Sequence, residues 1–203
     1  MAPHVIVDYP HRYVMRLALG PHDNRVYLVG DPETRDMVII DAATDARAIL
    51  EAADGWTVSA IITTHGHQDH VGAVEEVKEV LDIPFRMHPA DTEIAEMTPD
   101  VPLTDGDEIT VGRLMLRTEH TPGHTPGSCC FVMPPQLFSG DTLFPGGPGA
   151  TRWDYSSFPQ IMDSLDRRLF VLPDETMVFP GHGEGTTIGV ERPHIEEWRT
   201  RGW

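Results

Sequence analysis

The segment THGHQDH, residues 64–70, places three histidines and one aspartate within six positions. It follows an apolar run with the pattern of a buried strand. Side chains two residues apart on an extended chain point the same way, so His65 and His67 can hold one metal ion. Asp69 and His70 stand where the chain turns into the next predicted helix, and they can face a second ion. The segment therefore predicts a metal centre on a loop at the end of a strand.

Three further residues of ligand type stand in loops that also follow predicted strands: His124 in PGHT, Asp141 in SGDT and His182 in PGHG. Loops at strand ends are where a rigid scaffold presents chemistry. Imidazole and carboxylate ligands with almost no sulfur are typical of catalytic Zn(II), Fe(II) or Mn(II) sites. A lone loop histidine is usually solvated, but this many ligand-type residues in one pattern favour a metal site.

The order of predicted elements is mixed. β-type runs come first and are followed by a helix that Thr44 can cap. The strand before residues 64–70 leads to a helix over about Val71 to Leu81. Short strands follow, and a helix capped by Ser156 or Ser157 precedes the last clear strand. This order predicts an α/β fold with two sheets packed together and helices outside.

Composition predicts a single domain over residues 1–203, of which 40% are apolar. We expect a cytoplasmic protein without membrane association, because the chain has no signal peptide pattern and no run of about 20 apolar residues. The adjacent Cys129 and Cys130 are expected to be packing residues in a reducing compartment. A net charge of -17 disfavours nucleic acid as a partner. A homodimer, the commonest oligomer, is the expectation for assembly.

Taken together, the motifs resemble the metallo-β-lactamase superfamily, whose H-x-H-x-D-H motif stands here at residues 65–70. The resemblance extends from the DNRVYLV strand through PGHTPGS, SGD and PGHG. It implies an αββα sandwich of two mixed sheets, with two metal ions in the cleft between them. It also implies the ligands of each ion: His65, His67 and His124 for the first, Asp69, His70 and His182 for the second, and Asp141 bridging both. Asp41, in the IIDAA turn, supports the histidine-rich loop in this family and is not a ligand.

Single positions disfavour several branches of the superfamily. Gln68 stands where flavo-diiron oxygen reductases carry a carboxylate ligand, and antibiotic-hydrolysing β-lactamases generally have Cys or Ser at the place of Asp141. The nuclease branches need basic surface, which a chain of charge -17 does not offer. PGHTPGS, SGDTLFPGG and PGHGEGTTIG are most similar to glyoxalase II, a hydroxyacylglutathione hydrolase. Only residues 183–203 follow the last ligand, so the chain is similar to short members that lack the C-terminal helical domain of full-length glyoxalase II.

The resemblance implies a dinuclear metal-dependent hydrolase of acyl thioesters, acting on hydroxyacyl-glutathione or on an ester of another thiol carrier. Two divalent ions, Zn(II) with Fe or Mn as alternatives, lower the pKa of a shared water to about 7 and supply hydroxide for the attack. Asp69, or the water itself, handles the proton. A thiolate, whose parent thiol has a pKa of about 8.5, leaves without a strong general acid.

Three alternatives stay open. Lactones or other esters can be hydrolysed at the same site. The persulfide dioxygenases of the superfamily use one Fe(II), held by counterparts of His65 or His67, His124 and Asp141, all of which this chain has. A metal-stabilised binding protein is disfavoured, because members that abandon chemistry should lose ligands.

Substrate recognition is expected from the segment TLFPGGPGATRWDYSSF, residues 142–158. Phe144, Arg152 and Tyr155 in it are the candidate contacts to a small-molecule substrate. The guanidinium of Arg152 matches the geometry of a carboxylate. Its alternative role is a surface ion pair with Asp154.

The tetrapeptide HTPG occurs twice in succession in residues 120–127, and its two histidines are predicted to differ. His124 stands in the family's PGHT, and Pro122-Gly123 bends its loop towards the cleft. A second ligand at His120 would fill the open position that catalysis needs, so His120 is predicted to be a strand-end or supporting residue. His22, in PHDN, is interpreted as a solvated turn histidine, with the cleft rim as the alternative.

Overall fold

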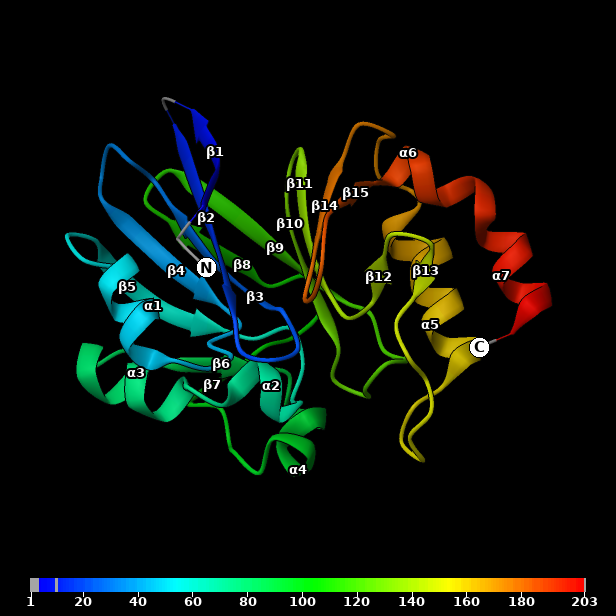
Figure 1. The fold of residues 1–203 in the computed structure, drawn as a ribbon, viewed down its shortest axis with the longest axis horizontal. Coiled ribbons are helices and arrows are strands. Elements are labelled where there is room, and N and C mark those ends of the chain that lie inside the picture. The colour runs from blue at the N-terminus through cyan, green and yellow to red at the C-terminus, as the bar shows by residue number, and fades with distance from the viewer. Residues whose placement is uncertain (1–3, 10, 203) are drawn as a thin grey trace.

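The computed structural model describes residues 4–9 and 11–202, and in it two β-sheets pack face to face between outer layers of helices (Figure 1). The first half of the chain builds one sheet with its helices, and the second half builds the other. The predicted α/β class and αββα sandwich are therefore confirmed.

The first sheet has seven strands in the order of the sequence. They are β1 (His4–Tyr9), β2 (Arg12–Leu19), β3 (Asn24–Gly30), β4 (Asp36–Ile40), β5 (Thr57–Ile62), β6 (Phe85–Met87) and β7 (Val101–Pro102). The pairs from β1 to β4 are antiparallel, and those from β4 to β7 are parallel. The carboxyl ends of β4, β5 and β6 therefore meet at one edge of the sheet.

The second sheet has six strands in the order β15-β14-β11-β10-β9-β8. They are β8 (Glu108–Val111), β9 (Leu114–His120), β10 (Cys129–Met133), β11 (Gln136–Gly140), β14 (Met177–Pro180) and β15 (Thr186–Thr187). Only β11 and β14 are parallel, so both sheets are mixed. A small hairpin of β12 (Leu143–Phe144) and β13 (Gly147–Pro148) follows β11.

Short helices cover the outer face of each sheet (Figure 1). On the first sheet these are α1 (Ala46–Ala52), α2 (Gln68–Val71), α3 (Val74–Leu81), the 3-10 turn η1 (Pro89–Asp91) and α4 (Thr92–Ala95). On the second they are α5 (Phe158–Ser164), the π-helical turn η2 (Leu165–Leu169), α6 (Ile188–Glu191), the 3-10 turn η3 (Arg192–His194) and α7 (Ile195–Arg201). The segment after His182 thus completes the helical layer of the second sheet.

Alternation along the central strands sends side chains into different cores. In β3, Tyr27 and Val29 face the space between the sheets, whereas Val26 and Leu28 face the helices. Both faces of the strand are covered, which is why it reads as an almost continuous apolar run.

The two cysteines of β10 are buried and free, as expected. Cys130 packs beneath the helices of the second sheet, while its neighbour Phe131 faces the first sheet. Burial raises the pKa of the Cys130 thiol to about 11, so this group is a packing residue with little thiolate character.

Two helix boundaries differ from those predicted. Asp45, not Thr44, caps α1, because its carboxylate accepts a hydrogen bond from Ala48 N. The helix predicted from about Val71 to Leu81 begins at Val74 as α3, and a separate short helix, α2, precedes it and ends before a turn at Gly72. A Cβ at Gly72 would lie 2.7 Å from Ala43 O, so the first turn packs tightly against the loop after β4.

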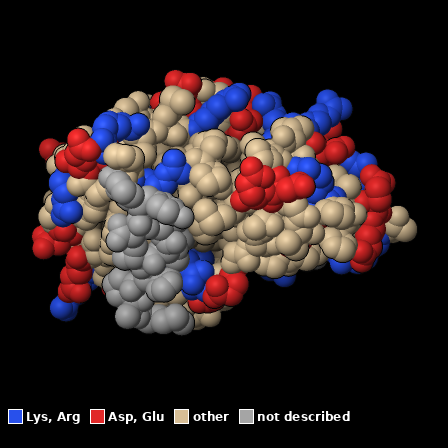
Figure 2. Space-filling view, turned by 90° about the horizontal axis from the view of Figure 1, so that it is seen from above, with Lys and Arg blue, Asp and Glu red and all other residues tan. Residues whose placement is uncertain are grey.

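Acidic and basic side chains are interspersed on the face of the molecule drawn in Figure 2. Among the described residues, many basic groups are paired with acidic ones, for example Arg168 with Asp105 and Arg199 with Asp166, both at 2.9 Å. On the described part of this face, basic side chains therefore do not gather into one patch. None of the helices within residues 4–9 and 11–202 is long and apolar enough to span a bilayer.

Candidate metal centre

The seven residues predicted to be ligands lie together where loops from both sheets meet. The segment of residues 65–70 follows β5 of the first sheet, whereas His124, Asp141 and His182 follow β9, β11 and β14 of the second. A cavity of about 580 Å³ opens over them. It is lined by His22, His67, Gln68, Asp69, His124, Asp141, Phe144, Ala150, Arg152, Trp153 and His182.

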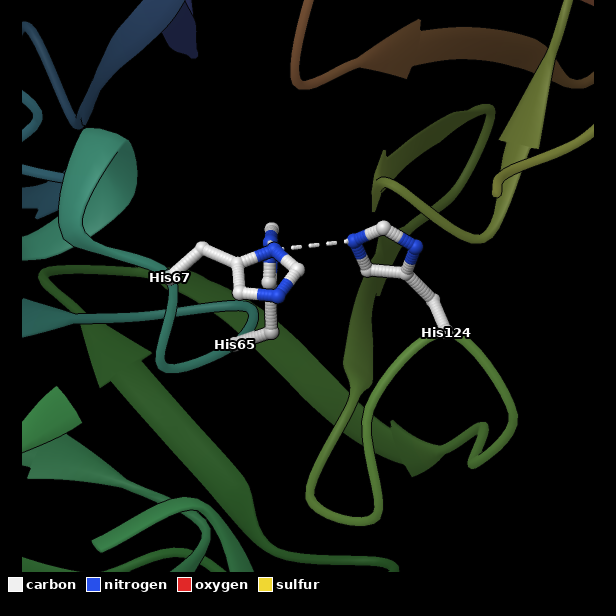
Figure 3. Close-up of side chains that lie close together, drawn as sticks. All are labelled: His65, His67 and His124. Atoms are coloured by element: carbon white, nitrogen blue, oxygen red, sulfur yellow. Dashed lines mark hydrogen bonds between the residues drawn. The ribbon is translucent and has the colours of Figure 1, made fainter. Parts of the chain in front are cut away.

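Three imidazoles form a first group. His65 Nε2 lies 3.0 Å from His67 Nδ1, which in turn lies 3.1 Å from His124 Nε2. Figure 3 shows the three rings, from the loop after β5 and the loop after β9, pointing towards one another. One ligand atom of each residue lies within 4.8 Å of the others, a spacing that a single ion can span.

Asp69, His70 and His182 form a second group of the same kind. His70 Nε2 lies 3.1 Å from His182 Nε2, and His182 Nε2 lies 3.5 Å from Asp69 Oδ2.

Asp141 lies between the two groups. Its Oδ2 is 3.5 Å from both His124 Nε2 and His182 Nε2, and its Oδ1 is 3.5 Å from His70 Nε2. Oδ1 is buried and has no hydrogen-bond partner among the described residues. A buried carboxylate oxygen without a donor is expensive unless a cation faces it.

The outer nitrogens of the rings fix where their protons are. His124 Nδ1 lies 2.7 Å from Ala150 O, and His182 Nδ1 lies 2.9 Å from His22 O. A carbonyl oxygen only accepts, so both rings carry a proton on Nδ1. In the neutral rings, each Nε2 atom carries a lone pair, and both Nε2 atoms face the cleft.

The remaining rings follow the same rule. His70 Nδ1 faces Asp41 Oδ2 at 3.0 Å, and His65 Nδ1 faces Thr64 Oγ1, which donates its own proton to Asp41. His67 Nε2 lies 2.8 Å from the Tyr155 hydroxyl, which can accept the Nε2 proton and so leave Nδ1 as a lone pair facing the other rings. With that tautomer, lone pairs from five imidazoles converge, and they repel one another unless a cation lies between them. The donor set fits divalent metal ions.

The first group is held in the neutral state that metal binding requires. Burial lowers the pKa of His65 well below its ordinary value, and nearby rings lower it further. Burial and His124 lower the pKa of His67 to about 4, and burial also lowers that of His124.

The second group favours positive charge. Burial opposes a charged His70 ring, but Asp141 and Asp41 outweigh it and raise the pKa of His70 to about 9. Two carboxylates therefore stabilise a cation at this place in the cleft.

Asp41 lies beneath the histidine-rich loop. Its carboxylate accepts hydrogen bonds from Thr64 N at 2.7 Å and Thr64 Oγ1 at 2.8 Å, in addition to contacting His70. It is buried and absent from every group of candidate ligands among the described residues.

The two HTPG histidines are separated by the fold. His124 faces the cleft because Gly123 adopts a φ of +142°, where a Cβ would lie 2.3 Å from Ile161 N. His120 ends β9, contacts Pro126 O at 2.9 Å and stacks on His88 with ring centroids 4.1 Å apart. It belongs to none of the candidate ligand groups.

The candidate substrate contacts divide into two sets. Phe144 and Arg152 line the cavity, and Arg152 lies over the ring of Trp153, 4.8 Å from its centroid. No ion pair joins it to Asp154 in the described part of the chain. His22, interpreted from sequence as solvated, lines the rim. Tyr155 instead contacts His67, so its nearest partner is a candidate ligand.

Two polar residues at the site were not predicted. Asn24, at the start of β3, donates from Nδ2 to Asp69 O at 2.6 Å and to Asp69 Oδ2 at 3.1 Å. Asp91, at the end of η1, is fully buried and accepts hydrogen bonds from both loops of the first group. The sequence did contain one usable signal for Asp91, because this residue stands shortly after the short strand β6, which lies parallel to β5.

Replacing Tyr155 by phenylalanine is expected to weaken the binding of one metal ion by about 10-fold, because His67 loses the acceptor that fixes its ring. Competition with a chromophoric chelator measures this affinity. The melting temperature should stay unchanged, since Tyr155 is 38% exposed. An unchanged affinity would mean that the hydroxyl does not orient His67.

Comparison with known proteins identifies relatives of this chain. The sequence profile of the metallo-β-lactamase superfamily matches residues 19–182. An uncharacterised protein of Aquifex aeolicus is 38% identical over 196 residues, covering 87% of this chain and 92% of that protein. The hydroxyacylglutathione hydrolase of Rhodopseudomonas palustris is 37% identical over 172 residues, covering 83% of this chain and 66% of that enzyme.

Solved structures agree with this assignment. ETHE1 from Myxococcus xanthus superimposes with a TM-score of 0.81 at 31% identity, covering 90% of this chain and 82% of that one. TTHA1623 in a di-iron-bound form superimposes with a TM-score of 0.78 at 36% identity, covering 87% of this chain and 96% of that one. By profile, sequence and fold, the chain belongs to the metallo-β-lactamase superfamily.

Proposed function

We propose that this protein is a dinuclear metal-dependent hydrolase of acyl thioesters. The observation that carries the proposal is the convergence of five imidazoles and two carboxylates, in which Asp141 contacts histidines of both groups. The similarity to a hydroxyacylglutathione hydrolase supports the substrate class. Zinc is the proposed metal; the di-iron form of TTHA1623 supports iron as the alternative, and manganese also suits these ligands.

Under this proposal His65, His67 and His124 would hold the first ion, Asp69, His70 and His182 would hold the second, and Asp141 would be a ligand shared by both. Bound metal ions would supply hydroxide at neutral pH and polarise the scissile carbonyl. The chain's own contribution is to fix the rings through their outer nitrogens.

Asp69 is the proposed proton acceptor. Burial opposes its charge, but His70 and the Asn24 amide lower its pKa below the ordinary value. It is therefore ionised at neutral pH. Asn24 binds Oδ2, and the carboxylate lines the cavity where a substrate would lie.

The cleft suits a good leaving group. Apart from the histidines, the acidic residues of the described lining are Asp69 and Asp141, both candidate metal ligands, so the lining offers no separate general acid for an amine leaving group. A thiolate needs no such donor, because its parent thiol has a pKa of about 8.5. Among the described residues of the lining, Arg152 is the one permanently cationic side chain, which favours a thiol carrier with a carboxylate near the Phe144 and Trp153 walls.

The test is hydrolysis of a panel of esters by the purified protein, with its metal content measured in parallel. We expect two metal ions per chain, and turnover of S-lactoylglutathione or of another anionic acyl thioester well above that of matched oxygen esters and lactones. Removal of metal by chelation should abolish the activity, and addition of Zn(II) should restore it.

Two outcomes would contradict the proposal. A single iron per chain with oxygen consumption on glutathione persulfide would identify a dioxygenase. Faster hydrolysis of lactones than of every thioester would move the substrate class to oxygen esters at the same site.

A further inference from the structure

We infer that Asp91 is a positioning residue that holds the two loops of the first histidine group at a fixed separation. The inference rests on the proposed metal centre, since it concerns the placing of His65, His67 and His124. Asp91 lies on the outer side of that group and does not face the cavity.

The Asp91 carboxylate joins both loops directly. Its Oδ2 accepts hydrogen bonds from Gly66 N at 2.8 Å and from Thr125 Oγ1 at 2.6 Å. Its Oδ1 accepts one from Gly127 N at 2.6 Å. The side chain is fully buried, so these donors replace water entirely, and loss of any one of them leaves a buried polar atom without a partner.

Two of the three donors are immediate neighbours of candidate ligands. Gly66 stands between His65 and His67, and Thr125 follows His124. Elsewhere the same loops are joined by Cys129 N donating to Thr64 O at 2.7 Å, close to the strand ends. Asp91 therefore fixes the outer parts of the loops, where the imidazoles project.

Both loops approach Asp91 as closely as glycine allows. A Cβ on Gly66 would lie 2.8 Å from Asp91 O, and a Cβ on Gly127 would lie 2.7 Å from Asp91 Cγ. These distances are shorter than van der Waals contact. The two glycines and the aspartate thus set the spacing of the loops together.

The sheet topology places a second aspartate, Asp41, on the other side of the loop after β5. Asp41 follows β4 and Asp91 follows β6, and these strands flank β5 in the sheet. Asp41 holds His70 of the second group directly and His65 of the first through Thr64, while Asp91 holds the first group through Gly66. The loop after β5 is therefore held from both sides by carboxylates, and Asp91 contacts only the part that carries the first group. Loss of Asp91 should disturb the first group more than the second.

The test is Asp91→Asn, which keeps the shape but replaces one acceptor oxygen by an NH2 donor. At least one of the three hydrogen bonds is then lost. Cobalt(II) titration of the whole protein, followed by visible absorption, reports the affinity and geometry of each ion. We expect the binding of one ion to weaken by about 10-fold or more and its absorption band to shift, with the other unchanged.

Two reference variants make the result specific. His67→Ala identifies the band of the first ion, which should be the band that Asp91→Asn alters. Asp31→Asn is the matched control: Asp31 is equally buried and accepts hydrogen bonds from Arg113 and Glu33 N, but it follows the far end of β3. It should lower the melting temperature and leave both cobalt affinities unchanged.

The outcomes separate the inference from the function on which it rests. A wild-type protein that binds no cobalt refutes the metal centre, and the role of Asp91 with it. If the wild type binds two ions and Asp91→Asn weakens neither, or both equally, the inference alone fails. Should Asp91→Asn not fold, Thr125→Val removes the hydrogen bond to Asp91, together with the contact to Ser128 Oγ, and should weaken the same ion to a smaller extent. An unchanged affinity there overturns the inference.

Discussion

Asp141→Ala is expected to release metal and to lower the rate of thioester hydrolysis by more than about 100-fold. Asp141 is the residue that contacts both groups of candidate ligands, through Oδ2 to His124 and His182 and through Oδ1 to His70. Without Asp141, the two groups of ligands lack the shared carboxylate whose negative charge would offset the positive charge of two metal ions.

The measurement is metal content after dialysis, combined with kcat for the best thioester of the panel. Asp154→Ala is a suitable control, because Asp154 is exposed in the same connecting region and does not line the cavity. The control should keep both ions and its activity. Unchanged turnover in Asp141→Ala would count decisively against a bridged centre.

The loss should not reflect unfolding. Among the described residues, Asp141 accepts no hydrogen bond that connects elements of the fold, and its contacts at 3.5 Å are with histidines of the site. Its removal takes away one carboxylate that raises the pKa of His70, but Asp41 remains 3.0 Å from that ring. Melting curves of the metal-free variant and the metal-free wild type, recorded side by side, show whether the variant is folded at the temperature of the assay.

The candidate ligands could be predicted from sequence because their signal is local. His65, His67, Asp69 and His70 stand within one short segment, and the others stand in loops directly after strands. The ends of neighbouring strands meet at one edge of a sheet, so local patterns suffice to bring such residues together in a prediction.

The residues that orient the ligands could not be predicted in this way. Tyr155 contacts His67 across 88 residues of sequence, and Asn24 contacts Asp69 across 45. The Tyr155 contact depends on how the two sheets pack, and the Asn24 contact depends on how β3 lies in the same sheet as β5. Periodicity carries no information about either. Asp91 shares this difficulty, since its hydrogen bonds join three separate loops.

Two helix boundaries were predicted wrongly for a related reason. Thr44 and Asp45 are both good capping residues, and the choice depends on backbone geometry, since Asp45 has a φ of +54°. The break at Gly72 depends on close contact with Ala43, a residue of another loop.

The second large effect is expected at the doubled tetrapeptide. His124→Ala should lose one metal ion per chain and more than about 100-fold of the rate, whereas His120→Ala should keep both ions. Elemental analysis of the two variants, purified and dialysed in the same way, tests the pair directly. The variants are matched, because each removes a histidine from the same four-letter sequence.

The physical difference lies in what each ring faces. His124 donates from Nδ1 to Ala150 O and so presents Nε2 to His67 and Asp141 in the cleft. His120 has its Nε2 against Pro126 O and its face against His88, so its truncation removes one hydrogen bond and one stacking contact. That loss should lower the free energy of unfolding by about 1 to 2 kcal/mol and leave the metal content alone. If His120→Ala lost metal and His124→Ala retained it, His120 would be the ligand in place of His124. The proposed membership of the first histidine group would then be wrong.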